Sequence, residues 1–200
     1  MTIQYQPGAA FGANIHKDGE TWTLVLVRTL SHPPAKVWHA LTDPAQIREW
    51  APYDPDRNLG TTGPVTLSTV GTPTPHVVQT SVQRAEAPRL LEFSWGGNDM
   101  RWELEPVYAG TEGATDDAPG TRLTLWHSIG RQYIAMGAAG WHICFDVLDA
   151  ILAGHPIGRI AGGDAMTFDG WHRLHAAYAT QFGNNDESTR RTQSASSRST

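Results

Sequence analysis

The 200-residue sequence lacks features that define several common classes of protein. It has one cysteine, Cys144, so no disulfide can form within the chain. It has no run of roughly 18 apolar residues, the minimum for a membrane-spanning helix. It has no basic excess either, because the formal net charge is −5 and the pI is about 5.9. A nucleic-acid-binding domain usually carries a basic face. We therefore expect neither a nucleic-acid partner nor a membrane partner.

Signals for secretion and for cofactor binding are also missing. Residues 1–20 contain no basic segment followed by an apolar core, so we expect a cytoplasmic protein. The GTTGP segment at 60–64 has neither the lysine nor the following helix of a phosphate-binding loop. Gly-Trp-His occurs at 140–142 and at 170–172, but these histidines supply too few converging ligands for zinc. We expect no cofactor and no metal, and we expect Cys144 to be a buried structural thiol.

A long amphipathic helix is the strongest pattern that the sequence does contain. Within 139–152, large apolar side chains recur at helical spacing: Trp141, Phe145, Leu148 and Leu152. The opposite, polar face carries His142, Asp146 and Asp149. Gly154 predicts the end of this helix. Because the chain before it is rich in strand patterns, we expect the apolar side to pack against a sheet.

The segments before this helix predict a run of antiparallel strands. Alternating apolar or β-branched residues indicate strands at 22–29, 65–70, 76–84, 90–95, 101–107 and 121–128. Two short helices are expected after the first strand, because Ser31 can cap a helix that opens at the following Pro-Pro pair and Asp43 can cap one that opens at Pro44. The order predicts an α+β fold, with helices on one side of a curved antiparallel sheet.

The same patterns divide the chain into four segments. These are an irregular N-terminal arm at 1–20, a domain of sheet and helix at 21–156, a linker and extra C-terminal helix at 157–183, and a disordered tail at 184–200. The extra helix is predicted over 167–182 and ended by Gly183. The tail has no large apolar residue. An acidic, glycine-rich stretch at 109–120 predicts a mobile hairpin tip.

Four sequence segments occur in a characteristic order and spacing. They are TLSHPPAKVWHALTDPAQIREW, APRLLEFSW, GTRLTLWHS and AGWHICFDVLDAILAG. Together they resemble the family of activator of heat-shock protein 90 ATPase homologues, within the SRPBCC (START-like, helix-grip) superfamily, over residues 21–154. The resemblance implies a curved antiparallel sheet wrapped around a long C-terminal helix, with an apolar cavity between them. The superfamily includes lipid carriers, hormone receptors, polyketide cyclases and co-chaperones.

The cavity implied by this resemblance would have a mainly apolar and aromatic lining. Side chains alternate along each strand, so one face of the strands and the apolar face of the helix would enclose it. The expected ligand-binding residues are Trp50, Phe93, Trp95, Trp102, Leu104, Leu125, His127, Trp141, Phe145 and Leu148. Such a lining suits a hydrophobic or aromatic small molecule. The alternative is a filled core without a usable cavity.

His127 is the polar member of this set, and its role is open. It can hydrogen-bond a ligand, act as an acid or base, or be satisfied by a backbone carbonyl. The leading hypothesis is a ligand-binding protein with little or no catalysis. One alternative is a polyketide cyclase-like or dehydratase-like enzyme, with His127 as its catalytic residue. Another is a chaperone-related interaction module. The helix at 167–182 can pack on the long helix, cover the cavity mouth or form a homodimer contact.

Overall fold

Eight antiparallel strands form one curved sheet in the computed structural model, which describes residues 5–72, 74–108 and 119–196. The strand order is β1-β2-β8-β7-β6-β5-β4-β3. The strands are β1 (Ala13–Asp18), β2 (Thr21–Leu30), β3 (Tyr53–Pro55), β4 (Gly63–Thr69), β5 (Val77–Glu86), β6 (Leu90–Trp95), β7 (Asn98–Val107) and β8 (Gly120–Ser128). The helices are α1 (Pro34–Thr42), α2 (Pro44–Ile47), the 3-10 turn η1 (Arg131–Tyr133), α3 (Ile134–Leu152), α4 (Gly162–Met166) and α5 (Asp169–Ser196). The predicted α+β class is confirmed.

Strand β1 lies where we expected an irregular arm, so that prediction is wrong for Ala13–Asp18. This strand pairs with β2 through a two-residue loop, in which Gly19 adopts a φ of +56°. A glycine with positive φ at the first loop position fits a tight hairpin turn. Most side chains of this edge strand are exposed, so it lacks the apolar alternation that marks a half-buried strand. The Asp18-Gly19 pair before a strong strand was the available signal.

The two short helices begin as their prolines predict, but they are capped differently. Asp43 caps α2, because its Oδ1 accepts hydrogen bonds from the N–H groups of Ala45 (2.9 Å) and Gln46 (3.2 Å). Helix α1 begins at Pro34 with Pro33 as N-cap and no side-chain cap. The expected role of Ser31 as a cap is therefore wrong. Proline at the first helical position has no N–H that needs a partner.

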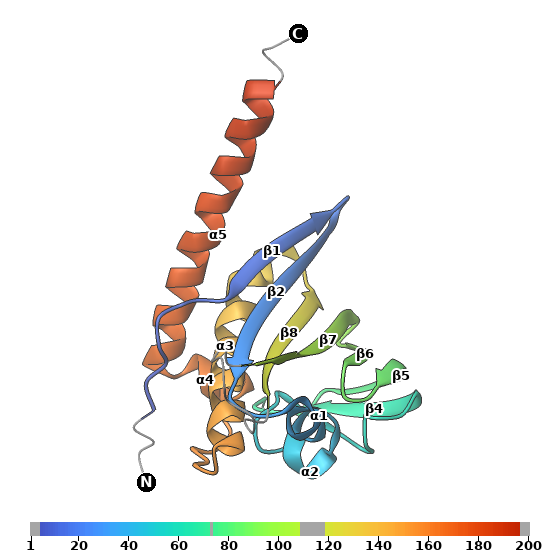
Figure 1. The fold of residues 1–200 in the computed structure, drawn as a ribbon. Helices are drawn as coiled ribbons and strands as arrows, with labels where there is room; N and C mark the ends of the chain where they lie inside the picture. The colour runs from blue at the N-terminus through green and yellow to red at the C-terminus, as the bar shows by residue number, and fades with distance from the viewer. Residues whose placement is uncertain (1–4, 73, 109–118, 197–200) are drawn as a thin grey trace.

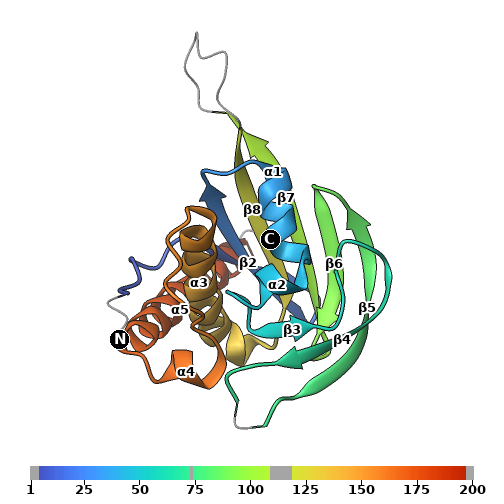
Figure 2. The ribbon, with the colours of Figure 1, turned by 90° about the horizontal axis from the view of Figure 1, so that it is seen from below.

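Helix α3 lies within the curve of the sheet, where it packs against α5 and strand β2 (Figure 2). It starts at Ile134, earlier than the sequence pattern indicated. It ends as predicted at Gly154, whose φ is +80°. The N–H groups of Gly154 and His155 donate to the carbonyls of Ile151 (3.0 Å) and Ala150 (2.9 Å). These two bonds satisfy the last turn of the helix in a Schellman arrangement.

Helix α5 packs along α3 and extends past the sheet (Figure 1). The four apolar residues that predicted it are buried: Trp171, Leu174, Tyr178 and Phe182. The predicted end at Gly183 is wrong, because the backbone stays helical to Ser196. Gly183 does not adopt the positive φ of a terminating glycine. Residues 184–196, where we expected disorder, thus continue the helix. The last residues of the predicted tail, 197–200, and most of the predicted hairpin tip, 109–118, lie outside the described residues.

One helical stretch of the described residues, Arg131–Leu152, is long and apolar enough to cross a bilayer by length and composition alone. In this fold the stretch contains α3, which packs against the sheet and α5. A core helix of a globular domain meets the same criterion. The apolar character of α3 is therefore explained by the core, and the part of the chain that the structure describes has no clear membrane span.

Candidate ligand-binding site

A pocket of about 380 Å³ lies at one end of the interface between the sheet and α3. Strands β6 and β8, helices α3, α4 and α5, and the loop after β4 contribute to its wall. The lining residues are Pro52, Gly71, Thr72, Trp95, His127, Ile129, Met136, Gly137, Gly140, Trp141, Cys144, Ala161, Gly162, Gly163, Ala165, Met166 and Trp171. This lining contains no Asp, Glu, Lys or Arg among the residues that the structure describes. The pocket is in the size range of small-molecule sites.

Tryptophan side chains form much of the wall. The rings of Trp95 and Trp141 meet edge to face, with centroids 6.1 Å apart and planes at 75°. The Trp95 N–H donates to the Thr69 hydroxyl at 3.3 Å, which fixes the orientation of its ring. Trp171 closes the wall from the first turn of α5. Aromatic rings of fixed orientation offer a large apolar contact surface to a planar ligand.

His127 reaches this pocket from β8, where it is paired with Leu24 on one side and Met100 on the other. Its side chain is only 3% exposed. The indole N–H of Trp141 donates to its Nδ1 at 3.1 Å. Its Nε2 is buried and has no hydrogen-bond partner among the residues described. Burial lowers the pKa of His127 to about 4, so the ring is neutral at pH 7.

The structure places Trp95, His127 and Trp141 in the pocket wall. The other seven expected ligand-binding residues lie in the hydrophobic core: Trp50, Phe93, Trp102, Leu104, Leu125, Phe145 and Leu148. Trp102 contacts Trp50 (centroids 5.9 Å apart), Trp141 (5.4 Å) and Phe145 (5.9 Å). These rings fill the space between the middle of the sheet and α3. The filled-core alternative therefore describes that region, and a pocket remains at the end of the interface.

Sequence reasoning missed the part of the wall that consists of small residues. Gly140 lies on α3, and a Cβ atom placed there would meet no heavy atom within 4 Å. Gly137, one helical turn away, also lines the pocket. The absence of a side chain at Gly140 leaves room beside the helix, whereas at Gly137 it allows close packing, because a Cβ there would lie 3.2 Å from Ile129 Cδ1 and 3.5 Å from Leu24 Cδ2. A pair of glycines three residues apart in a helix was the available signal, because glycine weakens a helix and needs another reason to be there.

Two glycine segments close the pocket by direct backbone contact. Gly71, after β4, accepts a hydrogen bond on its carbonyl from the N–H of Gly163 at 2.5 Å. A Cβ on Gly71 would lie 2.3 Å from the Ala161 carbonyl oxygen, and one on Gly162 would lie 2.3 Å from the Val70 oxygen. Both glycines also have positive φ, +70° and +59°. Only glycine permits this approach, so the 161–163 segment is fixed against the sheet.

His142 and Asp146, on the polar face of α3, are mostly covered by other parts of the chain. His142 is 1% exposed, and its Nδ1 lies 2.8 Å from the Tyr178 hydroxyl of α5. Asp146 pairs with Arg28 of β2 at 2.7 Å and accepts a hydrogen bond from Tyr5. Burial is the main cause that lowers the pKa of His142. Through these contacts, this face attaches the N-terminal segment and α5 to the domain. The described residues contain no group of three or more potential metal ligands.

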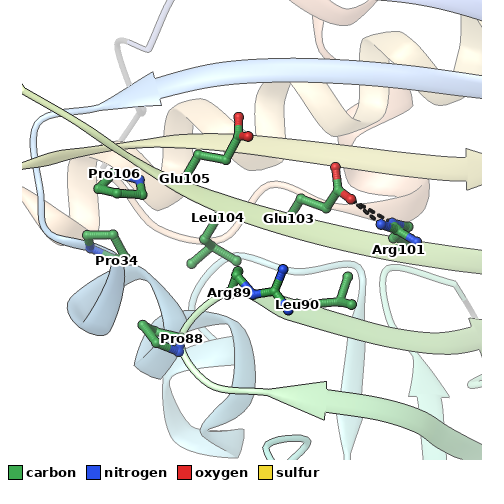
Figure 3. A pocket seen from close by; sticks show the side chains of 9 residues that line it. All are labelled: Pro34, Pro88, Arg89, Leu90, Arg101, Glu103, Leu104, Glu105 and Pro106. Atoms are coloured by element: carbon green, nitrogen blue, oxygen red, sulfur yellow. Dashed lines mark hydrogen bonds and ion pairs between the residues drawn. The ribbon is translucent and has the colours of Figure 1, made fainter.

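A second hollow, of about 360 Å³, lies by the start of α1 (Figure 3). Its lining consists of Pro34, Pro88, Arg89, Leu90, Arg101, Glu103, Leu104, Glu105 and Pro106. The charged groups are already paired: Arg101 with Glu103, Arg89 with Glu86, and Glu105 with Arg122. This hollow therefore offers a ligand less apolar surface and fewer unsatisfied polar groups than the tryptophan-lined pocket.

Residues 31–153 match the family described as Activator of Hsp90 ATPase homolog 1-like protein. The chain belongs to this family. No curated protein matches the sequence. The family assignment and the helix-grip fold expected from the sequence are thus confirmed. The match ends near the end of α3, so α4 and α5 lie outside it.

Solved structures agree with this fold. The conserved protein of unknown function EF2215 from Enterococcus faecalis is 16% identical, with a TM-score of 0.60 over 86% of this chain and 91% of that chain. CalU16 from Micromonospora echinospora, solved by solution NMR, is 21% identical, with a TM-score of 0.56 over 92% of this chain and 99% of that chain. Its crystal structure gives 24% identity and a TM-score of 0.53 over 84% and 93%. Identities this low establish the fold alone.

Proposed function

We propose that this protein binds an uncharged hydrophobic small molecule in the tryptophan-lined pocket. The observation that carries the proposal is a pocket of about 380 Å³ whose described lining holds no charged side chain. Apolar surface of this kind is removed from water when a ligand enters, which favours binding. A charged ligand would lose its hydration there without gaining a partner of opposite charge.

Binding is favoured over acid–base catalysis by the two titratable side chains of the lining, His127 and Cys144. Burial lowers the pKa of His127 to about 4 and raises the pKa of the Cys144 thiol to about 12. Both groups are therefore neutral at pH 7. General acid–base catalysis is most effective when the pKa of the group lies near the working pH, and a thiol must ionise to become a strong nucleophile. We infer a binding role in which the pocket holds its ligand without transforming it.

The test uses N-phenyl-1-naphthylamine, an uncharged aromatic probe that fluoresces in apolar surroundings. We expect saturable binding of one probe per chain. Gly140→Leu should weaken it at least tenfold, because the new side chain would project into the pocket space beside α3. Gly183→Leu is the matched control, since Gly183 is also helical and exposed, and a Cβ there meets nothing within 4 Å.

Equal probe affinity in the two glycine variants would refute binding in this pocket. Native mass spectrometry of the freshly purified protein, followed by denaturing extraction, would identify any molecule that copurifies. Loss of that molecule from Gly140→Leu, with retention in Gly183→Leu, would support the same site. Retention in both variants would count against it.

A further inference from the structure

We infer that the ligand of this pocket carries a hydrogen-bond-accepting oxygen, and that the Nε2–H of His127 donates to it. The inference rests on the proposed function and defines the ligand class as uncharged aromatic ketones, quinones and related carbonyl compounds. It starts from an observation that the binding of a plain hydrocarbon does not explain: the Nε2 of His127 is buried and has no partner in the part of the chain that the structure describes.

The hydrogen bond from Trp141 determines which nitrogen of His127 carries the proton. An indole N–H can only donate, so the Nδ1 atom 3.1 Å away must present its lone pair. In a neutral imidazole the proton is then on Nε2. The free nitrogen is consequently a donor, which suits a carbonyl oxygen and does not suit a second donor such as an ammonium group.

Three other polar groups of the wall are already occupied within the protein. The Trp95 N–H donates to Thr69, and the Thr72 hydroxyl donates to the Thr74 carbonyl at 2.8 Å. The Trp141 N–H is used by His127 itself. A buried N–H without an acceptor is unfavourable, and a ligand oxygen would supply the missing acceptor. His127 therefore discriminates between ligands of similar shape by the presence of that oxygen.

The remaining wall restricts the rest of the ligand. Rings of Trp95 and Trp141 stand at 75° to one another, and Trp171 adds a third ring. Flat, aromatic ligands make the most contact with such surfaces. A carboxylate or phosphate would find no Lys or Arg in the described lining, and an amine would find no Asp or Glu. These features together favour a planar aromatic compound with an uncharged carbonyl group.

A matched pair of compounds tests the inference. 9-Fluorenone and fluorene share the same fused rings and differ in one carbonyl oxygen. Their affinities are measured by displacement of N-phenyl-1-naphthylamine from the wild-type protein and from His127→Leu and His127→Gln. Comparing the fluorenone-to-fluorene ratio between proteins cancels the difference in water solubility of the two compounds. A Gln side chain can place an N–H near the position of Nε2, whereas Leu cannot.

We expect the fluorenone-to-fluorene affinity ratio to fall about tenfold in His127→Leu, as for loss of one hydrogen bond between neutral groups, and to be largely retained in His127→Gln. Gly183→Leu lies outside the pocket and keeps His127, so it should leave the ratio unchanged. An unchanged ratio in His127→Leu, with both compounds still binding, would overturn the inference while the proposed function stands. No binding of either compound or of the probe to the wild type would overturn both.

A measurement on the wild-type protein avoids dependence on the folding of a variant. In protein labelled with ¹⁵N-histidine, the His127 signals should show a proton on Nε2 in the free state. That proton should shift downfield on addition of 9-fluorenone and not on addition of fluorene. A proton on Nδ1, or an equal response to both compounds, would refute the assignment of His127 as the donor.

Discussion

Acidification from pH 7 to pH 5 is expected to destabilise this protein through His127. The folded-state pKa of this residue is lowered to about 4 by burial, from an ordinary value of 6.5. Between these two values the unfolded chain binds a proton that the folded protein does not bind. The free energy of unfolding therefore falls as the pH falls through this window. The contribution of His127 to stability is fully present above pH 6.5. The Trp141 N–H that points at Nδ1 also occupies the position where the second proton would have to go.

The size of the effect follows from the two pKa values. One pKa unit corresponds to about 1.4 kcal/mol, so the loss is about 2 kcal/mol at pH 5 and approaches about 3 kcal/mol near pH 4. His142 adds a loss of the same sign, because burial is the main cause that lowers its pKa as well. These losses are a large fraction of the free energy of unfolding, which is about 5–15 kcal/mol for a typical folded domain.

Urea denaturation at pH 7, 6 and 5 measures this loss in the wild type and in His127→Gln. The variant has no group at this position that titrates between pH 4 and 7, so its stability should fall by about 2 kcal/mol less than that of the wild type between pH 7 and pH 5. His142→Gln separates the contribution of the second buried histidine. Parallel pH dependence in the wild type and His127→Gln would show that His127 is not held neutral in the fold, and would refute the reasoning.

Two further predictions concern stability and are measured by urea denaturation at pH 7. Gly140→Ala should stabilise the protein by about 0.5–1 kcal/mol, because alanine favours a helix and a Cβ at this position meets only open space. Gly162→Ala should destabilise the protein, because a Cβ at this position would lie 2.3 Å from the Val70 oxygen. Equal effects of the two changes would contradict the assigned geometry. Arg28→Ala should lower the free energy of unfolding by about 2 kcal/mol or more, because the mostly buried Asp146 carboxylate loses its cation. A smaller loss in the double variant Asp146→Asn/Arg28→Ala than in Arg28→Ala would confirm the pairing.

Regular apolar patterns predicted most of the fold. The alternation in β6 and β8 and the helical spacing in α3 and α5 each reflect burial of one side of an element. Strand β1 was not predicted, because an edge strand with mostly exposed side chains has no such apolar pattern. The end of α5 was misjudged because Gly183 can stay helical as well as end a helix.

The candidate site was harder to predict because burial looks the same in a core and in a cavity wall. Trp102 and Trp141 both belong to apolar stripes, yet Trp102 is enclosed by other rings and Trp141 also lines the pocket. The difference depends on which partners meet across the sheet, which the sequence of one strand does not specify. Cytoplasmic location, a homodimer and a chaperone partner stay predictions.

The pocket draws its wall from both sides of residue 153, where the family match ends. Trp95, His127 and Trp141 come from within the matched part, and their positions are tied to the packing of the core. The segment from Ala161 to Trp171 comes from outside it and is held by backbone contact between glycines. Under the proposed function, the polarity and the size of the ligand would be controlled by separate stretches of chain. A change in 161–171 can reshape this part of the wall without altering His127, which comes from β8.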